Sequence, residues 1–304
     1  MEKKNNLSSN PLVSVIINCF NGEKYLEECL SSILNQSYKN WEVIFWDNHS
    51  TDNSKKIFHE FEDKRFKYFF SSEHTFLYEA RDLAIKASNG SLFAFCDVDD
   101  YWEKEKLELL VPLFNNDNIG VVYSNQWMLN DNSKKKKKRK KKNLPSGDIS
   151  SKIISEQPAT INTAIIKKSE YFKLEGGFNK NYQIIGDYDF FVRISKNCLF
   201  NCSQRPLTFY RLHSDNFTKK NRDIEISELE QWIQEIKRNY YLSKKDINLV
   251  NELILYKKIM DLILKNKKFS SISYLLRYPN NLKKIKLLFA LIIPISLLEK
   301  KKEF

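Results

Sequence analysis

The most restrictive feature of the sequence is a short apolar run that ends in three carboxylates. Residues 92–96 are apolar and partly aromatic, which predicts a buried strand rather than a helix. Asp97, Asp99 and Asp100 follow it directly. Carboxylates at the end of a buried strand are costly unless a positive group meets them. Because ligands of open α/β sheets bind beyond the carboxyl ends of strands, this turn is a candidate binding site. The alternative is a solvated acidic turn that caps the next helix.

Carboxylate oxygens two residues apart, as in Asp97 and Asp99, favour a hard divalent cation. Mg²⁺ or Mn²⁺ held in this way usually keeps open positions and bridges to phosphate oxygens of a substrate. The turn therefore predicts a site for a phosphate-bearing ligand.

Strand and helix patterns alternate through the first 124 residues. Short β-branched or aromatic runs predict strands at residues 12–18, 41–46, 66–70, 92–97 and 119–124. Helical periodicity predicts helices at residues 23–34 and 77–87, with a further helix around Ile57. This order predicts a mostly parallel α/β sheet flanked by helices. No G-x-G-x-x-G follows the first strand, which disfavours a dinucleotide oxidoreductase.

Five pieces of the sequence together resemble a known family. They are SVIINCFNG, YLEECLSSILNQSYKNWEVIFWDNHSTDNS, EARDLAIKASNGSLFAFCDVDDYW and the Gly-Gly-Phe-Asn and Gly-Asp-Tyr-Asp segments after residue 175. In order and spacing they resemble a family 2 glycosyltransferase of the bacterial polysaccharide or glycolipid type, over about residues 12–217. The resemblance implies the Rossmann-like GT-A fold and transfer of a sugar from a nucleotide-sugar, expected to be UDP-linked, to a hydroxyl of a glycan or lipid-linked acceptor.

The resemblance also implies how the donor is bound. Cys19 and Phe20 would line the pocket of the nucleotide base, and Asp47 would bond the base or ribose. Arg81 would lie near the base and phosphates, and Asp97 would contact the ribose.

Three further roles concern the metal and the chemistry. Asp99 would bind Mn²⁺ or Mg²⁺ with the diphosphate, and His213, within a YRxHxxN arrangement, resembles the family's histidine near that metal. Asp187 matches the catalytic base, with Gly186 where relatives usually have Glu. We expect the N-terminus of the following helix to stabilise Asp187 as a carboxylate. Asp189 points away from it and is interpreted as structural.

The formal net charge of +12 is concentrated in one run, residues 134–142, whose removal would leave about +3. Such a run predicts a solvated, extended basic loop at residues 131–147 within an irregular stretch from 125 to 150. A disordered insertion, contact with anionic lipid headgroups and nucleic-acid binding are alternatives. The run lacks interleaved aromatic residues, so lipid is favoured and a nucleic-acid partner is not expected.

The remaining chain predicts a catalytic domain at residues 1–222 and a helical extension at 223–304. Residues 282–302 carry an uncharged apolar piece of 12 residues between lysines, too short to span a bilayer and interrupted by Pro294. This pattern suits a segment on an anionic membrane surface, with a helix packed on the catalytic domain as the alternative.

The amino terminus has no apolar signal region, and the five cysteines contain no CxxC pair. We expect reduced thiols and a cytoplasmic enzyme, peripheral at the inner face of the cell membrane. The alternative function is a non-catalytic nucleotide-sugar-binding scaffold of the same fold.

Overall fold

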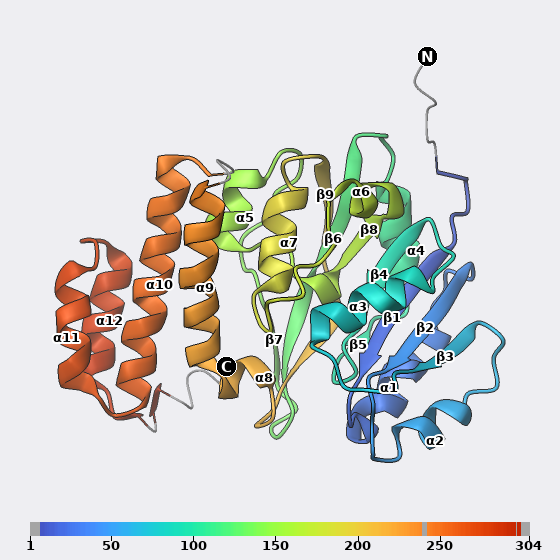
Figure 1. Ribbon diagram of the computed structural model, residues 1–304, viewed down its shortest axis with the longest axis horizontal. Helices are drawn as coiled ribbons and strands as arrows, with labels where there is room; N and C mark the ends of the chain where they lie inside the picture. Colours follow the sequence, from blue (N-terminus) through green and yellow to red (C-terminus); the bar gives the residue numbers. More distant parts are fainter. Residues whose placement is uncertain (1–6, 239–241, 296, 299–304) are drawn as a thin grey trace. The chain divides into compact units, whose positions relative to one another are not determined.

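The computed structural model describes residues 7–238, 242–295 and 297–298. The chain divides into two compact units (Figure 1). The first contains Met1–Leu129 and Lys135–Arg211, and the second contains Asn130–Lys134 and Leu212–Phe304. Each unit is described by itself.

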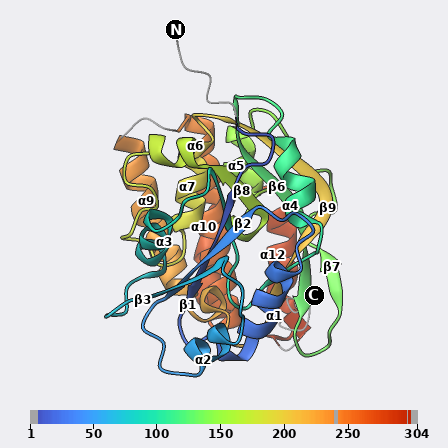
Figure 2. The same ribbon diagram turned by 90° about the vertical axis from the view of Figure 1, so that its right-hand side faces the viewer.

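The first half of unit 1 is a parallel α/β sheet. Its strands lie in the order β3-β2-β1-β4 and all pair in parallel: β1 (Val13–Cys19), β2 (Trp41–Asp47), β3 (Phe66–Phe70) and β4 (Leu92–Phe95). The intervening helices are α1 (Glu23–Leu34), α2 (Ser54–His59) and α3 (Leu77–Lys86). Figure 2 shows β3, β2 and β1 side by side. The predicted alternation is confirmed, and the register that pairs Cys19 with Asp47 brings two strand ends to one edge.

Helix α1 shows why these segments fold as predicted. Leu26, Cys29, Leu30 and Ile33 are fully buried and recur with the spacing of one helix face. They pack in one core with alternate residues of β1 and β2 and with Trp102. Burial of one such leucine contributes about 1.5–3 kcal/mol.

The second half of unit 1 extends the sheet with antiparallel strands. They are β5 (Tyr101–Trp102), β6 (Ile119–Asn130), β7 (Lys136–Lys138), β8 (Ala164–Lys167) and β9 (Leu199–Leu212). The full order in the described part of the chain is β3-β2-β1-β4-β8-β6-β9-β5, with β7 paired to β6. The helical pieces between them are α4 (Lys106–Leu110), η1 (Val111–Leu113), α5 (Ser150–Glu156), η2 (Ile161–Thr163), α6 (Lys168–Lys173) and α7 (Gly186–Ile194). The predicted α/β class is confirmed: β1–β4 pair in parallel, and β8 joins β4 to β6 through antiparallel pairs.

The prediction of an irregular stretch at residues 125–150 is wrong. Strand β6 continues to Asn130, and β7 pairs antiparallel with it inside the basic run, with Leu129 opposite Lys136 and Trp127 opposite Lys138. Strand β6 supplies backbone partners, while the lysine side chains of β7 remain exposed to solvent. The backbone ladder therefore forms without burying the charges that were expected to prevent it.

Unit 2 contains helices α8 (Phe217–Lys220), α9 (Arg222–Arg238), α10 (Lys244–Leu264), α11 (Lys268–Arg277) and α12 (Leu282–Ile292). A reciprocal capping box of Ser243 and Asp246 starts α10. A small core of residues from α10, α11 and α12 includes Ile259, Ile263 and Leu287. Among the described residues, no helix has both the length and the apolar character of a membrane span. Residues 296 and 299–302 of the predicted membrane-surface segment lie outside the described residues.

Candidate functional site

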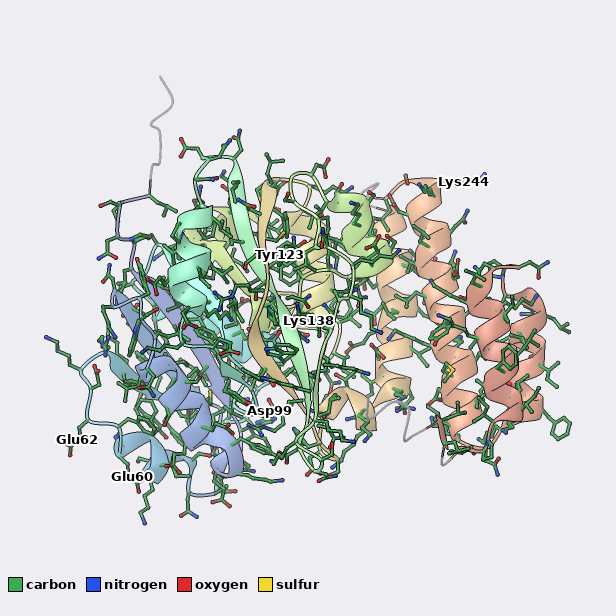
Figure 3. The ribbon with its side chains drawn as sticks, turned by 180° about the vertical axis from the view of Figure 1, so that it is seen from behind. Glu60, Glu62, Asp99, Tyr123, Lys138 and Lys244 are labelled. Carbon is green, nitrogen blue, oxygen red and sulfur yellow. The ribbon has the colours of Figure 1, made fainter. Side chains whose placement is uncertain are left out.

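The acidic turn after β4 is held by one buried arginine. Arg81 on α3 is 3% exposed and donates from Nη2 to Oδ1 of Asp97 at 2.6 Å. Burial raises the pKa of Asp97, and the carboxylate of Asp99 raises it further while Arg81 opposes both. The structure thus supplies the positive group that the sequence required. Figure 3 shows Asp99 within this part of unit 1.

Asp100 has a different environment from Asp97. It is 1% exposed, and it accepts hydrogen bonds from Nδ2 of Asn162 at 2.5 Å and from the backbone N–H of Arg211 at 3.0 Å. Burial raises the pKa of Asp100 well above its usual range, with added repulsion from Asp99 and Asp97. These bonds tie the acidic turn to β9, so Asp100 positions the turn.

Arg81 lies beside two aromatic rings. Its guanidinium carbon is 5.4 Å from the Tyr78 ring centre and 6.0 Å from that of Phe178. Burial tends to lower the pKa of Arg81, but the charges of Asp97, Tyr78 and Asp187 raise it on balance. Arg81 therefore remains a cation between Asp97 and Asp187.

Asp47, at the end of β2, is 1% exposed. Its Oδ2 accepts from the Tyr68 hydroxyl at 2.6 Å, and its Oδ1 accepts from the backbone N–H of Ser50 at 2.8 Å. The carboxylate fixes the loop after β2, and each oxygen has one further lone pair for a ligand.

Cys19 and Phe20 lie at the neighbouring end of β1 with opposite exposure. Cys19 is buried, and burial raises the pKa of its thiol to about 11. Phe20 is 49% exposed, and its ring centre is 4.1 Å from that of His74. The exposed ring is suited to stacking on a planar ligand such as a nucleotide base, whereas the Cys19 side chain belongs to the core.

Asp187 occupies the first turn of α7, next to Tyr78. Its Oδ1 accepts from the backbone N–H of Tyr188 at 2.8 Å. The expectation that the helix end would keep its pKa low is wrong, because burial raises the pKa of Asp187 against the opposing charges of Arg81 and Arg139. A carboxylate with a raised pKa is a stronger proton acceptor.

The Tyr78 ring explains why position 186 is glycine and not the glutamate that the family resemblance implies. A Cβ at this position would lie 2.5 Å from Cδ2 and Cε2 of Tyr78. Tyr78 is 2% exposed and its hydroxyl donates to the carbonyl oxygen of Ile184 at 2.8 Å, so it has little room to move. The close approach of Tyr78 therefore requires glycine beside the candidate base.

Asp189, on the same helix, has a structural partner. Its Oδ2 accepts from Nε of Arg193 at 2.9 Å, and Arg193 also donates from Nη2 to the carbonyl oxygen of Gly177 at 2.7 Å. Asp189 thus fastens α7 to the Gly-Gly loop before it.

His213 belongs to unit 2 and is described there alone. Its Nδ1 accepts from the backbone N–H of Asp215 at 3.1 Å, and its backbone N–H donates to Oδ1 of Asn216 at 2.8 Å. The YRxHxxN arrangement is thus a tight turn. Across the described residues, no three His, Cys, Asp or Glu side chains gather as a metal cluster.

The acidic turn fits a divalent cation by its donors and its charge. Asp99 offers hard oxygens, and repulsion between it and its neighbours raises the pKa of Asp97 and of Asp100. A second cation beside Arg81 would relieve that repulsion. One or two carboxylates suffice for Mg²⁺ or Mn²⁺ when substrate phosphates complete the coordination.

Sequence reasoning assigned no role to three positive groups that lie close to the site residues. Lys106 is fully buried, donates from Nζ to the carbonyl oxygen of Asn162 at 2.6 Å, and has its pKa lowered to about 7 by burial. Arg211 donates from Nε to the carbonyl oxygen of Asp99 at 2.9 Å. Arg139 acts on Asp187 from within the basic run. In the sequence, Arg139 is distinguished only as the one arginine within the run of lysines at residues 134–142.

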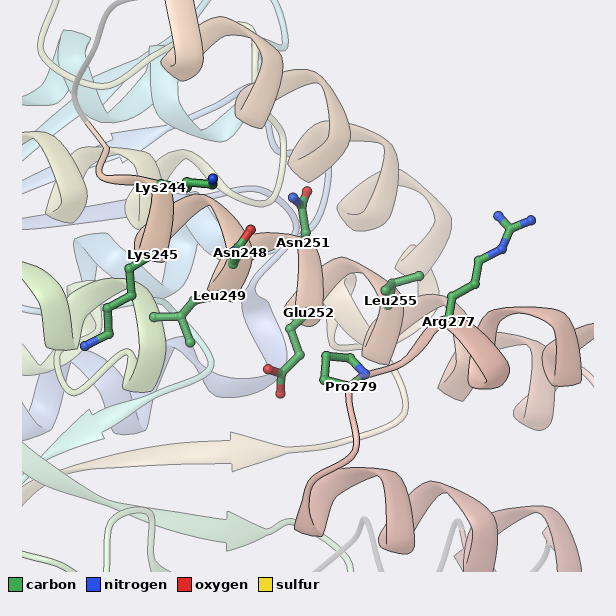
Figure 4. Close-up of a pocket in the computed structure, with 9 residues that line it drawn as sticks. All are labelled: Lys244, Lys245, Asn248, Leu249, Asn251, Glu252, Leu255, Arg277 and Pro279. Carbon is green, nitrogen blue, oxygen red and sulfur yellow. The ribbon is translucent and has the colours of Figure 1, made fainter.

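A surface pocket lies elsewhere, on unit 2 (Figure 4). None of the predicted site residues lines it. The lining residues come from α10 and the end of α11: Lys244, Lys245, Asn248, Leu249, Asn251, Glu252, Leu255, Arg277 and Pro279.

Comparison with known proteins identifies the class that this fold and site define. The model of the family described as glycosyl transferase family 2 matches residues 14–203. The chain therefore belongs to glycosyl transferase family 2, and it is a glycosyltransferase.

Two curated relatives match along most of their length. An uncharacterized glycosyltransferase of Haemophilus influenzae is 31% identical over 277 residues, covering 87% of this chain and 85% of the relative. The Escherichia coli protein WfgD, a UDP-Glc:alpha-D-GlcNAc-diphosphoundecaprenol beta-1,3-glucosyltransferase, is 28% identical, covering 76% of this chain and 90% of the relative.

Two solved structures have the same fold. TarS 1–349 of S. aureus in complex with UDP-GlcNAc aligns with a TM-score of 0.65 at 18% identity, covering 88% of this chain and 81% of TarS. The mannosyltransferase PcManGT of Pyrobaculum calidifontis, in complex with GDP-Man and Mn²⁺, aligns with a TM-score of 0.62 at 16% identity, covering 92% and 79%.

Proposed function

We propose that the chain is an inverting, metal-dependent glycosyltransferase that takes a sugar from a UDP-sugar and builds a bacterial surface polysaccharide or glycolipid. The observation that carries the proposal is the buried pair of Arg81 and Asp97 in the acidic turn, with Asp187 close enough for its charge to act on Arg81. The donor phosphates and the catalytic base Asp187 would then both lie within the field of the Arg81 charge. The similar TarS structure in complex with UDP-GlcNAc and the E. coli relative named for UDP-Glc support the choice of UDP.

The donor would be held at the carboxyl ends of β1, β2 and β4. Phe20 would stack on the base, Asp47 would accept a bond from base or ribose, and Asp97 would contact the ribose. Asp99 would hold Mn²⁺ or Mg²⁺, which neutralises charge on the leaving diphosphate. We assign His213 to the same metal and diphosphate on the family resemblance.

Asp187 would act as the general base. Its carboxylate accepts the proton of the acceptor hydroxyl while that oxygen bonds to the anomeric carbon and the bond to the nucleoside diphosphate breaks. The attack comes from the face opposite the leaving group, so the configuration inverts. The raised pKa of Asp187 supports this role.

The experiment is a calorimetric titration of UDP, GDP, CDP and dTDP, each with and without Mn²⁺. We expect metal-dependent binding of UDP that is lost in Asp99→Ala and kept in Asp187→Asn. If no nucleoside diphosphate binds with or without the metal, the donor assignment is wrong. If UDP binds but no sugar is transferred to any acceptor in an extract of glycans and glycolipids, the alternative of a non-catalytic nucleotide-sugar-binding scaffold is favoured.

We further propose a lipid-linked acceptor and a peripheral position on an anionic membrane surface. The E. coli relative acts on a diphosphoundecaprenol-linked sugar, as its name states. On α12 an apolar stripe is exposed, with Ile285 at 50%, Phe289 at 61% and Ile292 at 80%. Phe269 on α11 is 91% exposed. Basic residues beside such a stripe, among them Lys286, suit an anionic interface.

Vesicle sedimentation tests the membrane proposal. The double variant Phe289→Ser/Ile292→Ser should lower sedimentation with vesicles of anionic phospholipid, because each buried apolar side chain contributes about 1.5–3 kcal/mol. Phe172→Ser is the matched control, since this phenylalanine is 55% exposed on α6 of unit 1. Equal sedimentation of the double variant and the wild type would contradict the membrane proposal.

A further inference from the structure

The segment that follows β7 is fastened to its neighbours by backbone and side-chain bonds. The backbone N–H of Arg139 donates to the carbonyl oxygen of Gln126 at 2.9 Å. Asn125 bonds both polar backbone groups of Lys140, accepting from its N–H at 3.2 Å and donating to its carbonyl oxygen at 2.8 Å. Nζ of Lys140 also donates to the carbonyl oxygen of Glu156 at the end of α5. Arg139 and Lys140 are therefore held in place by bonds beyond the β6–β7 ladder.

The guanidinium of Arg139 has far more donor capacity than it uses. The side chain is half-buried, and within the described residues its hydrogen bond is a single long one, from Nη1 to the carbonyl oxygen of Pro158 at 3.4 Å. A guanidinium carries five N–H donors in a planar fork. A half-buried guanidinium with unused donors is a candidate contact for an anionic ligand.

A chain of contacts connects this guanidinium to the helix that carries Asp187. Pro158 follows α5, and α5 is bonded to α7 because the Tyr188 hydroxyl donates to the carbonyl oxygen of Ile154 at 3.5 Å. Asp187 directly precedes Tyr188. Burial lowers the pKa of Arg139, and the charges of Asp187 and Tyr210 oppose that change. Arg139, Tyr210 and Asp187 therefore share one charged environment.

We propose that Arg139 binds the diphosphate of the acceptor, placing the acceptor hydroxyl at the carboxylate of Asp187. The proposal rests on the glycosyl transfer proposed above and names one acceptor contact for it. An arginine fork matches two phosphate oxygens, whereas an ammonium acts as a single point charge. The diphosphate of an acceptor is favoured over lipid headgroups, because Arg139 is half-buried and its charge acts on Asp187, whereas the lysines of β7 are exposed.

The experiment uses decyl diphosphate as the probe, titrated by calorimetry into the full chain with UDP and Mn²⁺ at saturation. Arg139→Gln should weaken binding about tenfold or more, since it removes hydrogen bonds between charged groups. Arg139→Lys should restore part of the affinity. Lys141→Gln, an exposed change two residues away, is the matched control and should alter binding less than about twofold. Decyl alcohol should bind all four proteins alike.

Each result decides the proposal. Equal losses in Arg139→Gln and Lys141→Gln would mean diffuse attraction by the whole run and would overturn it, as would unchanged binding in Arg139→Gln or no binding to the wild type. If Arg139→Gln instead lowers sedimentation with anionic vesicles and spares decyl diphosphate, Arg139 contacts lipid headgroups. If the wild type binds no nucleoside diphosphate, the donor assignment fails, and titration without UDP still tests Arg139. Thermal unfolding checks that each variant is folded. If Arg139→Gln does not fold, the affinity of Arg139→Lys for decyl diphosphate tests the proposal in its place.

Discussion

Substitution of two aspartates on α7 should affect different properties: Asp187→Asn should lower the catalytic rate, and Asp189→Asn should lower the stability of the fold. Asp187→Asn keeps the shape of the side chain and an oxygen for the N–H of Tyr188, but it removes the proton acceptor. Loss of a general base lowers kcat by about 100- to 10,000-fold. Asp189→Asn removes the charged partner of Arg193, which costs about 1–3 kcal/mol of unfolding free energy, while the base remains.

The sign of the stability change follows from the pKa of Asp187. Burial raises that pKa above the usual value, so the ionised side chain costs stability at neutral pH. The Asp187→Asn variant lacks this cost and should unfold at the same temperature as the wild type or higher. The difference should shrink as pH falls through the raised pKa, because the wild-type carboxyl then takes up a proton.

The assay combines nucleoside diphosphate release with thermal unfolding from pH 4 to pH 8. For the wild type, kcat/KM should fall on the acidic side at a pH above the ordinary aspartate pKa of about 3.9. The reasoning is refuted if Asp189→Asn loses as much kcat as Asp187→Asn without unfolding, or if Asp187→Asn keeps more than about a tenth of the activity.

Three further changes test the structure around the site. Gly186→Ala should destabilise the fold by about 1–3 kcal/mol and lower activity, because its Cβ would lie 2.5 Å from the Tyr78 ring; a thermal melt unchanged from the wild type would contradict this. Lys67 and other partners lower the pKa of Glu42 to about 2, so its carboxylate should stabilise the fold by up to about 3 kcal/mol above pH 4.5. This stabilisation should disappear as the pH falls towards 2. In an acid titration, Glu42→Gln should therefore lose less unfolding free energy than the wild type. Deleting residues 134–142 should lower the unfolding temperature, because β7 pairs with β6, whereas Lys141→Gln should not.

The parallel half of the sheet was predictable because its signals are local. Apolar runs and helical spacing depend on neighbours within a few residues, so β1–β4 and α1 could be read from residue order alone. The acidic turn after β4 followed for the same reason, as did the need for a positive partner.

Other parts depended on contacts between distant segments. The length of β6 and the pairing of β7 required a partner strand whose register no local pattern gives. The burial of Asp47 under Tyr68 and the close contact of Gly186 with Tyr78 likewise join residues that are far apart in the chain.

The sequence by itself therefore determined the fold class, the acidic turn and the choice of Asp187 as the candidate base. Only the tertiary structure decided the electrostatics of that base, because the pKa of a carboxyl depends on its burial and on nearby charges. Those charges come from Arg81 on α3 and Arg139 after β7, which are 106 and 48 residues away along the chain. Folding brings these arginines close to Asp187, and burial strengthens the effect of their charges on its pKa.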